Sequence, residues 1–394
     1  MSASYHHGIR VVEVDSGTRP IRSLTTAVIG VVGTAPDADA AAFPLDTPVL
    51  IAGSRSQAAK LDTTGDGLGT LAHVMDAIFQ QTAPLIIVVR IASSEDEAEQ
   101  LSHVIGNVAA DGHYSGLQAL LGAQTQLGIK PRLLGAPGFS HQRDVADALG
   151  TLAENLRAFA YVDLSADKAT DAITQRENFG QRRLMLLWPA VSFWSTRIAA
   201  SVPMPASAFA LGLRAKIDNH TGWYKVISNE VLAGINGLSH PVTWDLQNPT
   251  TDAGLLNQNA ITTLIRQDGF RFWGSRTCSA DPRFAFESAV RTSDILCDTI
   301  AQAHLWAMDK PLSQTLIQDI IDGINTKFRA LKTTGHIVNA HCYLDPEYNL
   351  TDTLGDGQLH LHYDFTAVPP LEQMCLYTQI TDQYLIELLP QSQA

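Results

Sequence analysis

Leu85-Ile86-Ile87-Val88-Val89 decides the fold class of this 394-residue chain. The run is apolar at every position, which is typical of a strand that is buried on both faces of a sheet. Leu184-Met185-Leu186-Leu187-Trp188 repeats the pattern about a hundred residues later. The two runs predict central strands of a sheet that carries helices on each side.

Segments around these runs alternate between strand-like and helix-like patterns. The predicted strands are residues 26–32, 132–134 and 158–162, and the predicted helices are residues 68–80, 95–105 and 142–156. This rhythm predicts α/β layering around a largely parallel sheet. After residue 201 the pattern becomes irregular, because Pro203 and Pro205 interrupt a stretch rich in Ser and Ala.

The last third of the chain has a different pattern. Two long helices are predicted, at residues 281–308 and 312–332. The second has an apolar stripe at helical spacing, formed by Ile317, Ile320, Ile321, Ile324, Phe328 and Leu331. Residues 359–365 then alternate strictly between apolar and polar, which predicts a strand, and residues 5–14 are also strand-like.

The sequence therefore predicts a multidomain protein of mixed α/β and α+β class. Residues 1–25 are predicted to form an extended N-terminal arm and residues 26–240 an α/β domain around the central sheet. Residues 241–358 are predicted to form a C-terminal α+β domain, and residues 359–394 a C-terminal strand and extended arm. A lone strand at a terminus leaves backbone groups unpaired unless another sheet accepts it.

Charge and cysteine content exclude several functional classes. The net charge of -13 opposes binding to nucleic acid, because that affinity comes mainly from clustered Lys and Arg. No Lys or Arg follows Lys332, whereas eight Asp or Glu residues do. The four cysteines are widely spaced and suggest free thiols. No apolar run predicts membrane insertion or a secretory signal, so we expect synthesis and assembly in the host cytoplasm.

Motifs for catalysis, cofactor binding and metal binding are incomplete. The glycines of residues 30–35 lack the dinucleotide-binding order, and the calcium-like loop of residues 62–67 lacks the Glu that would close it. Ser140-His141 has no hydrolase motif around it. The pairs His6-His7 and His360-x-His362 have no third ligand nearby in the sequence. We therefore predict no catalytic residue, cofactor or metal, and interpret these segments as structural.

Several motifs carry a resemblance to a known family. They include Tyr5-His6-His7-Gly8-Ile9-Arg10-Val11, Thr26-Ala27-Val28-Ile29-Gly30, Arg132-Leu133-Leu134-Gly135-Ala136-Pro137-Gly138, Leu213-Arg214-Ala215-Lys216-Ile217-Asp218, Asp268-Gly269-Phe270-Arg271-Phe272-Trp273-Gly274-Ser275-Arg276-Thr277-Cys278 and Val368-Pro369-Pro370-Leu371-Glu372. Over nearly its whole length the chain resembles the tail-sheath proteins of contractile-tailed phages (myoviruses) and R-type pyocins.

The resemblance implies hexameric rings of this chain, stacked helically around a tail tube, that contract and drive the tube through a target cell envelope. It also implies partners at the two ends of the tail, a baseplate and a tail terminator. The α/β domain would lie outside and the C-terminal domain inside against the tube, where it would accept extended arms from neighbouring subunits.

Candidate assembly residues follow from this resemblance. The predicted inter-subunit arm contacts are Ile9, Val11, Val14, Leu359, Leu361, Tyr363, Phe365, Met374, Leu376 and Ile380. The predicted tube-facing residues are Lys327, Arg329 and Lys332, although cations near a helix C-terminus also have a purely local explanation in the helix dipole. A non-contractile phage scaffold protein and an α/β enzyme are the alternative functions.

Overall fold

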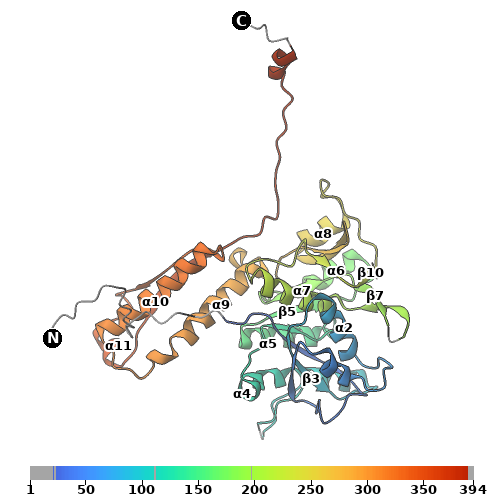
Figure 1. The fold of residues 1–394 in the computed structure, drawn as a ribbon, viewed down its shortest axis with the longest axis horizontal. Coiled ribbons are helices and arrows are strands. Elements are labelled where there is room, and N and C mark those ends of the chain that lie inside the picture. Colours follow the sequence, from blue (N-terminus) through green and yellow to red (C-terminus); the bar gives the residue numbers. More distant parts are fainter. Residues whose placement is uncertain (1–20, 22–23, 111, 197, 389–394) are drawn as a thin grey trace, which may run out of the picture.

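The computed structural model describes residues 21, 24–110, 112–196 and 198–388 (Figure 1). The predicted strand at residues 5–14, with Ile9, Val11 and Val14, lies outside these ranges.

A nine-stranded sheet forms the centre of the described chain. Its order is β2-β3-β1-β4-β5-β6-β11-β12-β9. The strands from β3 to β11 pair in parallel, and β2, β12 and β9 add antiparallel edges. The largely parallel sheet predicted from the sequence is therefore confirmed. The strands are β1 (Val28–Thr34), β2 (Pro48–Ala52), β3 (Leu85–Ile91), β4 (Leu133–Gly135), β5 (Phe159–Asp163), β6 (Leu184–Leu187), β9 (Val231–Leu232), β11 (Ile261–Arg266) and β12 (Phe270–Trp273).

Helices cover both faces of this sheet. In β3, Ile86 and Val88 belong to one hydrophobic cluster, whereas Ile87 and Val89 belong to another on the opposite face. This confirms the two-sided burial predicted for the apolar run at residues 85–89. The first face is covered by α2 (Leu71–Gln81) and α7 (Ala206–His220), and the second by α3 (Glu97–Ile105), α5 (Arg143–Leu156) and α8 (Asp252–Gln258).

Smaller elements complete the sheet domain. An antiparallel sheet of three strands has the order β10-β7-β8. The remaining elements are α1 (Arg55–Ala58), η1 (Ala59–Leu61), η2 (Gly116–Gly122), α4 (Ala123–Leu127), α6 (Ala169–Arg176), β7 (Val191–Ser195), β8 (Ala200–Met204), β10 (Ile235–Leu238) and η3 (Pro282–Phe284).

Helix α7 corrects the prediction of an irregular segment after residue 201. It begins at Ala206, directly after Pro205, and most of its residues are buried. A helix that is buried nearly all round has no polar face, so the amphipathic pattern that marks a surface helix is absent. Pro205 marks the start of this helix and does not interrupt it.

The predicted boundary at residues 240 and 241 falls inside the central sheet. Strands β11 and β12 follow that boundary in sequence, but β11 pairs in parallel with β6 and β12 pairs with β11. The chain thus returns to the sheet after its proline-containing loops. The change to the C-terminal unit comes after β12.

The C-terminal unit consists of two long helices and a β-hairpin. These are α9 (Glu287–Ala303), α10 (Gln314–Thr333), β13 (Ile337–Leu344) and β14 (Leu361–Ala367), with η4 (Leu305–Ala307) and α11 (Thr351–Gly355) in the connections. The predicted stripe of α10 is confirmed in part, because Ile320, Ile324, Phe328 and Leu331 are buried in a hydrophobic cluster of this unit, whereas Ile317 and Ile321 are only partly buried and lie outside it. The hairpin packs on α10 and also contacts α9.

After β14 the chain leaves the body as an extended segment (Figure 1). Residues 369–388, here called the C-terminal arm, contain no strand and end in a short turn of helix, η5 (Gln383–Leu388).

Candidate functional site

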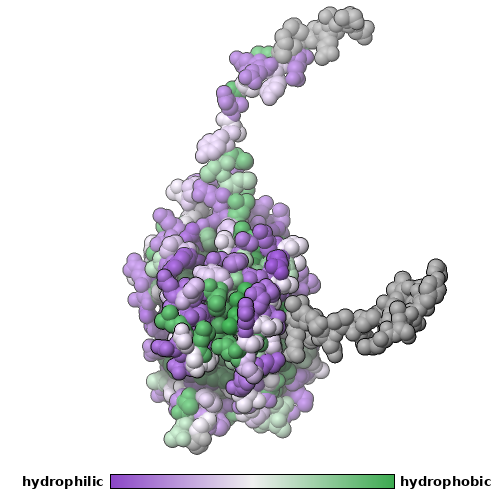
Figure 2. Space-filling model, turned by 90° about the vertical axis from the view of Figure 1, so that its left-hand side faces the viewer, coloured by the Kyte–Doolittle hydropathy of each residue, from purple (hydrophilic) through white to green (hydrophobic). Residues whose placement is uncertain are grey.

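The C-terminal arm exposes apolar side chains that the described chain does not cover. Tyr377 is 96% exposed and Ile380 is 99% exposed. Leu371, Met374 and Leu376 are also largely exposed, so the predicted arm residues Met374, Leu376 and Ile380 all face away from the body. Figure 2 shows apolar and polar residues following one another along the projecting arm. Several large apolar side chains exposed on one short segment are typical of a segment that binds a partner.

An ion pair fixes the base of the arm to the body. The guanidinium of Arg276 donates from Nε to Glu372 Oε1 at 2.8 Å and from a terminal nitrogen to Oε2 at 2.6 Å. Two parallel bonds of this type set a direction as well as a distance. The arm therefore leaves the body from a defined point next to the sheet domain.

The hairpin has one edge that is partly closed and one that is open. The Asn325 side chain of α10 donates to the Cys342 carbonyl and accepts from the Cys342 amide, both at 2.8 Å. Cys342 of β13 lies opposite Tyr363 of β14. In such an antiparallel pair both residues point their backbone groups outward, so the groups of Tyr363 face the far edge of β14. Within the described residues no strand lies along that edge.

Four residues predicted to contact neighbouring subunits pack within the chain's own C-terminal unit. Leu359, Leu361, Tyr363 and Phe365 lie against the hydrophobic cluster of α9 and α10. The strand predicted at residues 359–365 is found two residues later, as β14, and β13 supplies its partner within the same chain. The predicted lone strand is therefore wrong, because the second strand of the hairpin was not identified.

The far end of the C-terminal unit carries a further apolar area. Figure 2 faces this end and shows apolar residues surrounded by polar ones. Leu305 and Met308, in the connection between α9 and α10, are 75% and 61% exposed. This end offers a second surface for protein contact.

The predicted tube-facing cations lie on two different sides of α10. Arg329 and Lys332 are exposed, and Lys327 is half-buried. Burial lowers the pKa of Lys327. Arg329 donates to the Thr326 hydroxyl at 2.8 Å, a contact within the helix. Of the three, Arg329 and Lys332 are the residues that present charge to solvent.

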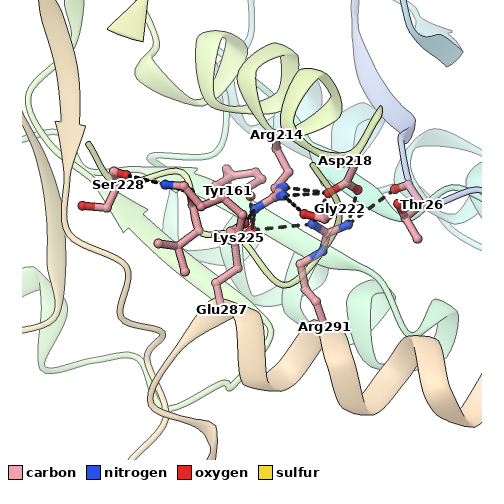
Figure 3. Close-up of polar contacts among 10 residues, drawn as sticks. Thr26, Tyr161, Arg214, Asp218, Gly222, Lys225, Ser228, Glu287 and Arg291 are labelled. Atoms are coloured by element: carbon pink, nitrogen blue, oxygen red, sulfur yellow. Dashed lines mark hydrogen bonds and ion pairs between the residues drawn. The ribbon is translucent and has the colours of Figure 1, made fainter. Parts of the chain in front are cut away.

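A buried ionic network joins the two parts of the chain (Figure 3). Arg214 of α7 pairs with Asp218 at 2.7 Å and with Glu287 of α9 at 3.4 Å. Arg291 of α9 pairs with Asp218 at 2.5 Å, and the Tyr161 hydroxyl donates to Glu287 at 2.6 Å. The charged side chains are almost completely buried. Burial of an unpaired charge carries a large desolvation penalty, so each of these charged groups requires its partners.

A second group of ion pairs lines the other half of α9. Asp294 binds Arg183, and Asp298 binds Lys130, Arg132 and Arg157. These four cations lie at the starts of β4, β5 and β6, directly before or within three residues of each strand. Helix α9 therefore runs along the amino ends of the parallel strands, held by charge on both of its halves. Sequence analysis missed this seam, because the charged partners of α9 lie between 73 and 168 residues away from it in the sequence.

Two aspartates of the seam, Asp218 and Asp298, make the fold sensitive to acid. Burial alone would raise the pKa of Asp218, but Arg291 and Arg214 outweigh it and hold that pKa below its usual value. Burial would also raise the pKa of Asp298, but Arg132 and Lys130 outweigh it and lower that pKa. A carboxyl with a lowered folded pKa stabilises the protein above its unfolded pKa of about 4, and this stability is lost as the pH falls through the folded value.

We expect the urea midpoint of unfolding to drop steeply as the pH falls below about 4. The Asp298→Asn variant should be less stable than the parent at pH 7 and should lose less on acidification, since one of the responsible carboxyls is gone. Urea titrations from neutral to acidic pH measure both effects. An acid-dependent loss of equal size in parent and variant would contradict the assignment of Asp298.

The residues considered for chemistry have structural roles. Ser140 is buried and donates to Asp163 at 2.9 Å. Asp62 accepts hydrogen bonds from the backbone amides of Gly65 and Gly67, and these bonds shape the calcium-like loop of residues 62–67. Gly30 and Gly33 lie inside β1, and a Cβ at Gly33 would stand 2.4 Å from the Thr70 hydroxyl. Gly33 permits close packing of the start of α2 on the sheet, and Gly30 permits close packing of Pro131 and Leu120 on the other face.

The described ranges contain no cluster of three His, Cys, Asp or Glu residues suited to a metal ion. His360 and His362 each contact the ring of Tyr348. His6 and His7 lie outside the described residues. Among the helices of the described chain, none combines the length and apolar character needed to cross a membrane.

Comparisons with known proteins agree on one family. Residues 112–278 match the phage tail sheath protein central domain, and residues 279–381 match the phage tail sheath C-terminal domain. The tail sheath protein of Escherichia phage P2 is 47% identical over 394 residues, which cover 98% of each chain. The major tail sheath protein of Serratia phage KSP20 is 40% identical and covers 98% of this chain and 97% of its own length.

Solved structures share the same architecture. The helical sheath of the anti-feeding prophage in its contracted state matches with a TM-score of 0.71 at 20% identity, over 95% of this chain and 98% of that one. At this identity the likeness shows the fold alone. With two family matches side by side and relatives at up to 47% identity over nearly the full length, the chain belongs to the phage tail sheath protein family.

Proposed function

We propose that this structural subunit polymerises into hexameric rings stacked helically around a tail tube, and that the sheath contracts to drive the tube through a target envelope. The observation that carries the proposal is the C-terminal arm, whose apolar side chains are exposed at up to 99% and are not covered by the described part of their own chain. Membership of the sheath family removes the enzyme alternative. A non-contractile scaffold would form no second, more compact lattice.

The partners follow from the same proposal. The subunit binds further copies of itself, a tail tube protein, and baseplate and terminator proteins at the two ends of the tail. One similar solved structure is the baseplate of the anti-feeding prophage, averaged with 6-fold symmetry. Assembly takes place in the host cytoplasm, and the product is the tail of a phage or of a tail-like particle.

Strand addition at the hairpin links the subunits. The open edge of β14 offers outward backbone groups, and an arm from a neighbouring subunit pairs with them. Each backbone hydrogen bond contributes about 0.5–1.5 kcal/mol net, so a strand of several residues makes a stable link. The arm of one subunit and the hairpin of the next stay connected while the sheet domains rotate and repack during contraction.

The proposed outer and inner domains correspond to the two parts of the fold. We place the outer domain at residues 26–278 and the inner domain from residue 279 to the end of β14, so that the seam along α9 lies between them. This moves the boundary from residue 240 to the junction of the two family matches. Inward placement of α10 brings Arg329 and Lys332 to the tube.

Reversal of the exposed charges tests the tube contact. The double variant Arg329→Glu, Lys332→Glu is expected to form sheaths that release the tube more readily at moderate salt, because an acidic tube surface would be repelled. Co-sedimentation of sheath with tube measures retention. The matched control is Lys60→Glu, Lys168→Glu, which changes the charge equally on exposed residues of the sheet domain. Equal retention in both variants would favour the local helix-dipole explanation.

A further inference from the structure

The carboxylate of Asp298 is shared by three cations. Arg132 binds Oδ2, Arg157 binds Oδ1 at 2.7 Å, and Lys130 lies 3.4 Å from Oδ2. The neighbouring group around Arg183 is balanced, since Arg182 and Arg183 face Glu154 and Asp294. The Asp298 cluster, defined as Asp298 with Lys130, Arg132 and Arg157, therefore holds two positive charges more than its one carboxylate, although Asp294 also attracts Arg157 while it is paired with Arg183.

This excess is notable in a chain of net charge -13. Burial lowers the pKa of Lys130, and the charges of Arg132 and Arg157 lower it further, against the pull of Asp298. A second carboxylate at the cluster would relieve this repulsion. Access exists from one side, because the side chain of Arg157 is 46% exposed and that of Lys130 is 22% exposed, while Arg132 is buried.

The cluster lies beside the open edge of the hairpin. Asp298 belongs to α9, which packs against β14. The charge of Arg157 acts on the Tyr363 hydroxyl, whose pKa burial raises to about 12. Tyr363 is the residue of β14 whose backbone groups face the open edge. A strand added along this edge would pass close to Arg157.

The C-terminal arm has the matching chemistry. It contains Glu372, Asp382 and Glu387 and no Lys or Arg. Glu372 is already bound to Arg276 in the same chain, which leaves Asp382 and Glu387 toward the tip. Figure 1 shows that the tip points away from its own body, so the cluster it reaches belongs to another copy.

We propose that the Asp298 cluster is an anchor for the acidic tip of the C-terminal arm of a second copy, with Asp382 or Glu387 placed between Arg157 and Lys130. The proposal rests on strand addition as the proposed function, and adds a specific polar contact to it. Apolar residues of the arm supply most of the affinity, and the ion pair sets the register in which the arm lies along β14.

A double-mutant cycle between chain and arm tests the anchor. The probe is a fluorescently labelled peptide of residues 369–394, titrated with the dispersed full-length chain and followed by anisotropy. The peptide with Asp382→Asn and Glu387→Gln, here called the amide peptide, is expected to bind about five-fold more weakly than the parent peptide. A higher salt concentration is expected to narrow this difference in affinity. The affinity of the Arg157→Gln chain for the parent peptide should fall by about the same factor. Its affinity for the amide peptide should equal that of the parent chain for the same peptide.

Controls separate this inference from the proposed function. Arg329→Gln removes another exposed arginine and is expected to leave peptide affinity unchanged. A peptide with Met374→Asp and Ile380→Asp should not bind, because strand addition buries these side chains. If Arg157→Gln weakens both peptides equally, or neither, the anchor is refuted while strand addition stands. Failure of the parent peptide to bind at its solubility limit refutes the anchor and counts against strand addition as well.

Discussion

A chain truncated after Val368 is expected to fold normally but to form no sheath. The truncation removes the C-terminal arm, whose apolar residues are exposed in the free subunit and contribute nothing to its core. The hairpin stays complete, because β14 ends at Ala367. Analytical ultracentrifugation and negative-stain microscopy should find a monomer under conditions that assemble the full chain, and circular dichroism should find the same thermal transition.

A longer truncation is the informative comparison. Removal of residues 359–394 deletes β14 as well, and takes Leu361, Tyr363 and Phe365 from the C-terminal cluster. Burial of a large apolar side chain contributes about 1.5–3 kcal/mol, so this variant should be destabilised in addition to being unable to assemble. Ordered tubes formed by the shorter truncation would refute the role of the arm.

Replacement of Arg214 by Met is expected to destabilise the protein by about 3–5 kcal/mol, the cost of leaving a buried partner charge uncompensated. Arg214 is fully buried between Asp218 and Glu287 and also donates to the Gly222 carbonyl at 3.1 Å. Met fills much of the same space but neutralises neither carboxylate. Urea unfolding at pH 7 measures the loss.

The control is Arg283→Met, which breaks an exposed pair with Asp281. No measurable change in the urea midpoint is expected there, because solvent screens exposed pairs. A midpoint for Arg214→Met close to that of the parent would show that the network does not hold α9 to the sheet domain.

The sequence predicted those parts of the fold that repeat locally. The runs at β3 and β6 are apolar throughout, and α10 has its stripe at helical spacing, so each could be assigned from a short window. Helix α7 could not, because it is buried nearly all round and has no polar face. Strand β11 was missed as a member of the central sheet, because nothing in its own residues tells which strand it pairs with.

Only part of the candidate site was predicted from the sequence. The arm residues Met374, Leu376 and Ile380 were predicted from the resemblance to the sheath family, since residues 369–388 have no regular pattern that marks them. The partner of β14 was missed, and with it the packing of Leu361, Tyr363 and Phe365 in their own chain. The ionic seam of α9 depends on contacts between residues far apart in the sequence. Its local signs were two pairs of opposite charge four residues apart, Arg214 with Asp218 in α7 and Glu287 with Arg291 in α9.

Negative-stain electron microscopy of the concentrated full-length chain tests the central claim most directly. The account predicts hollow, striated tubes with a helical lattice, formed by the chain alone or around added tail tubes. Dispersed single particles under both conditions, from a chain that is folded by circular dichroism, would contradict it.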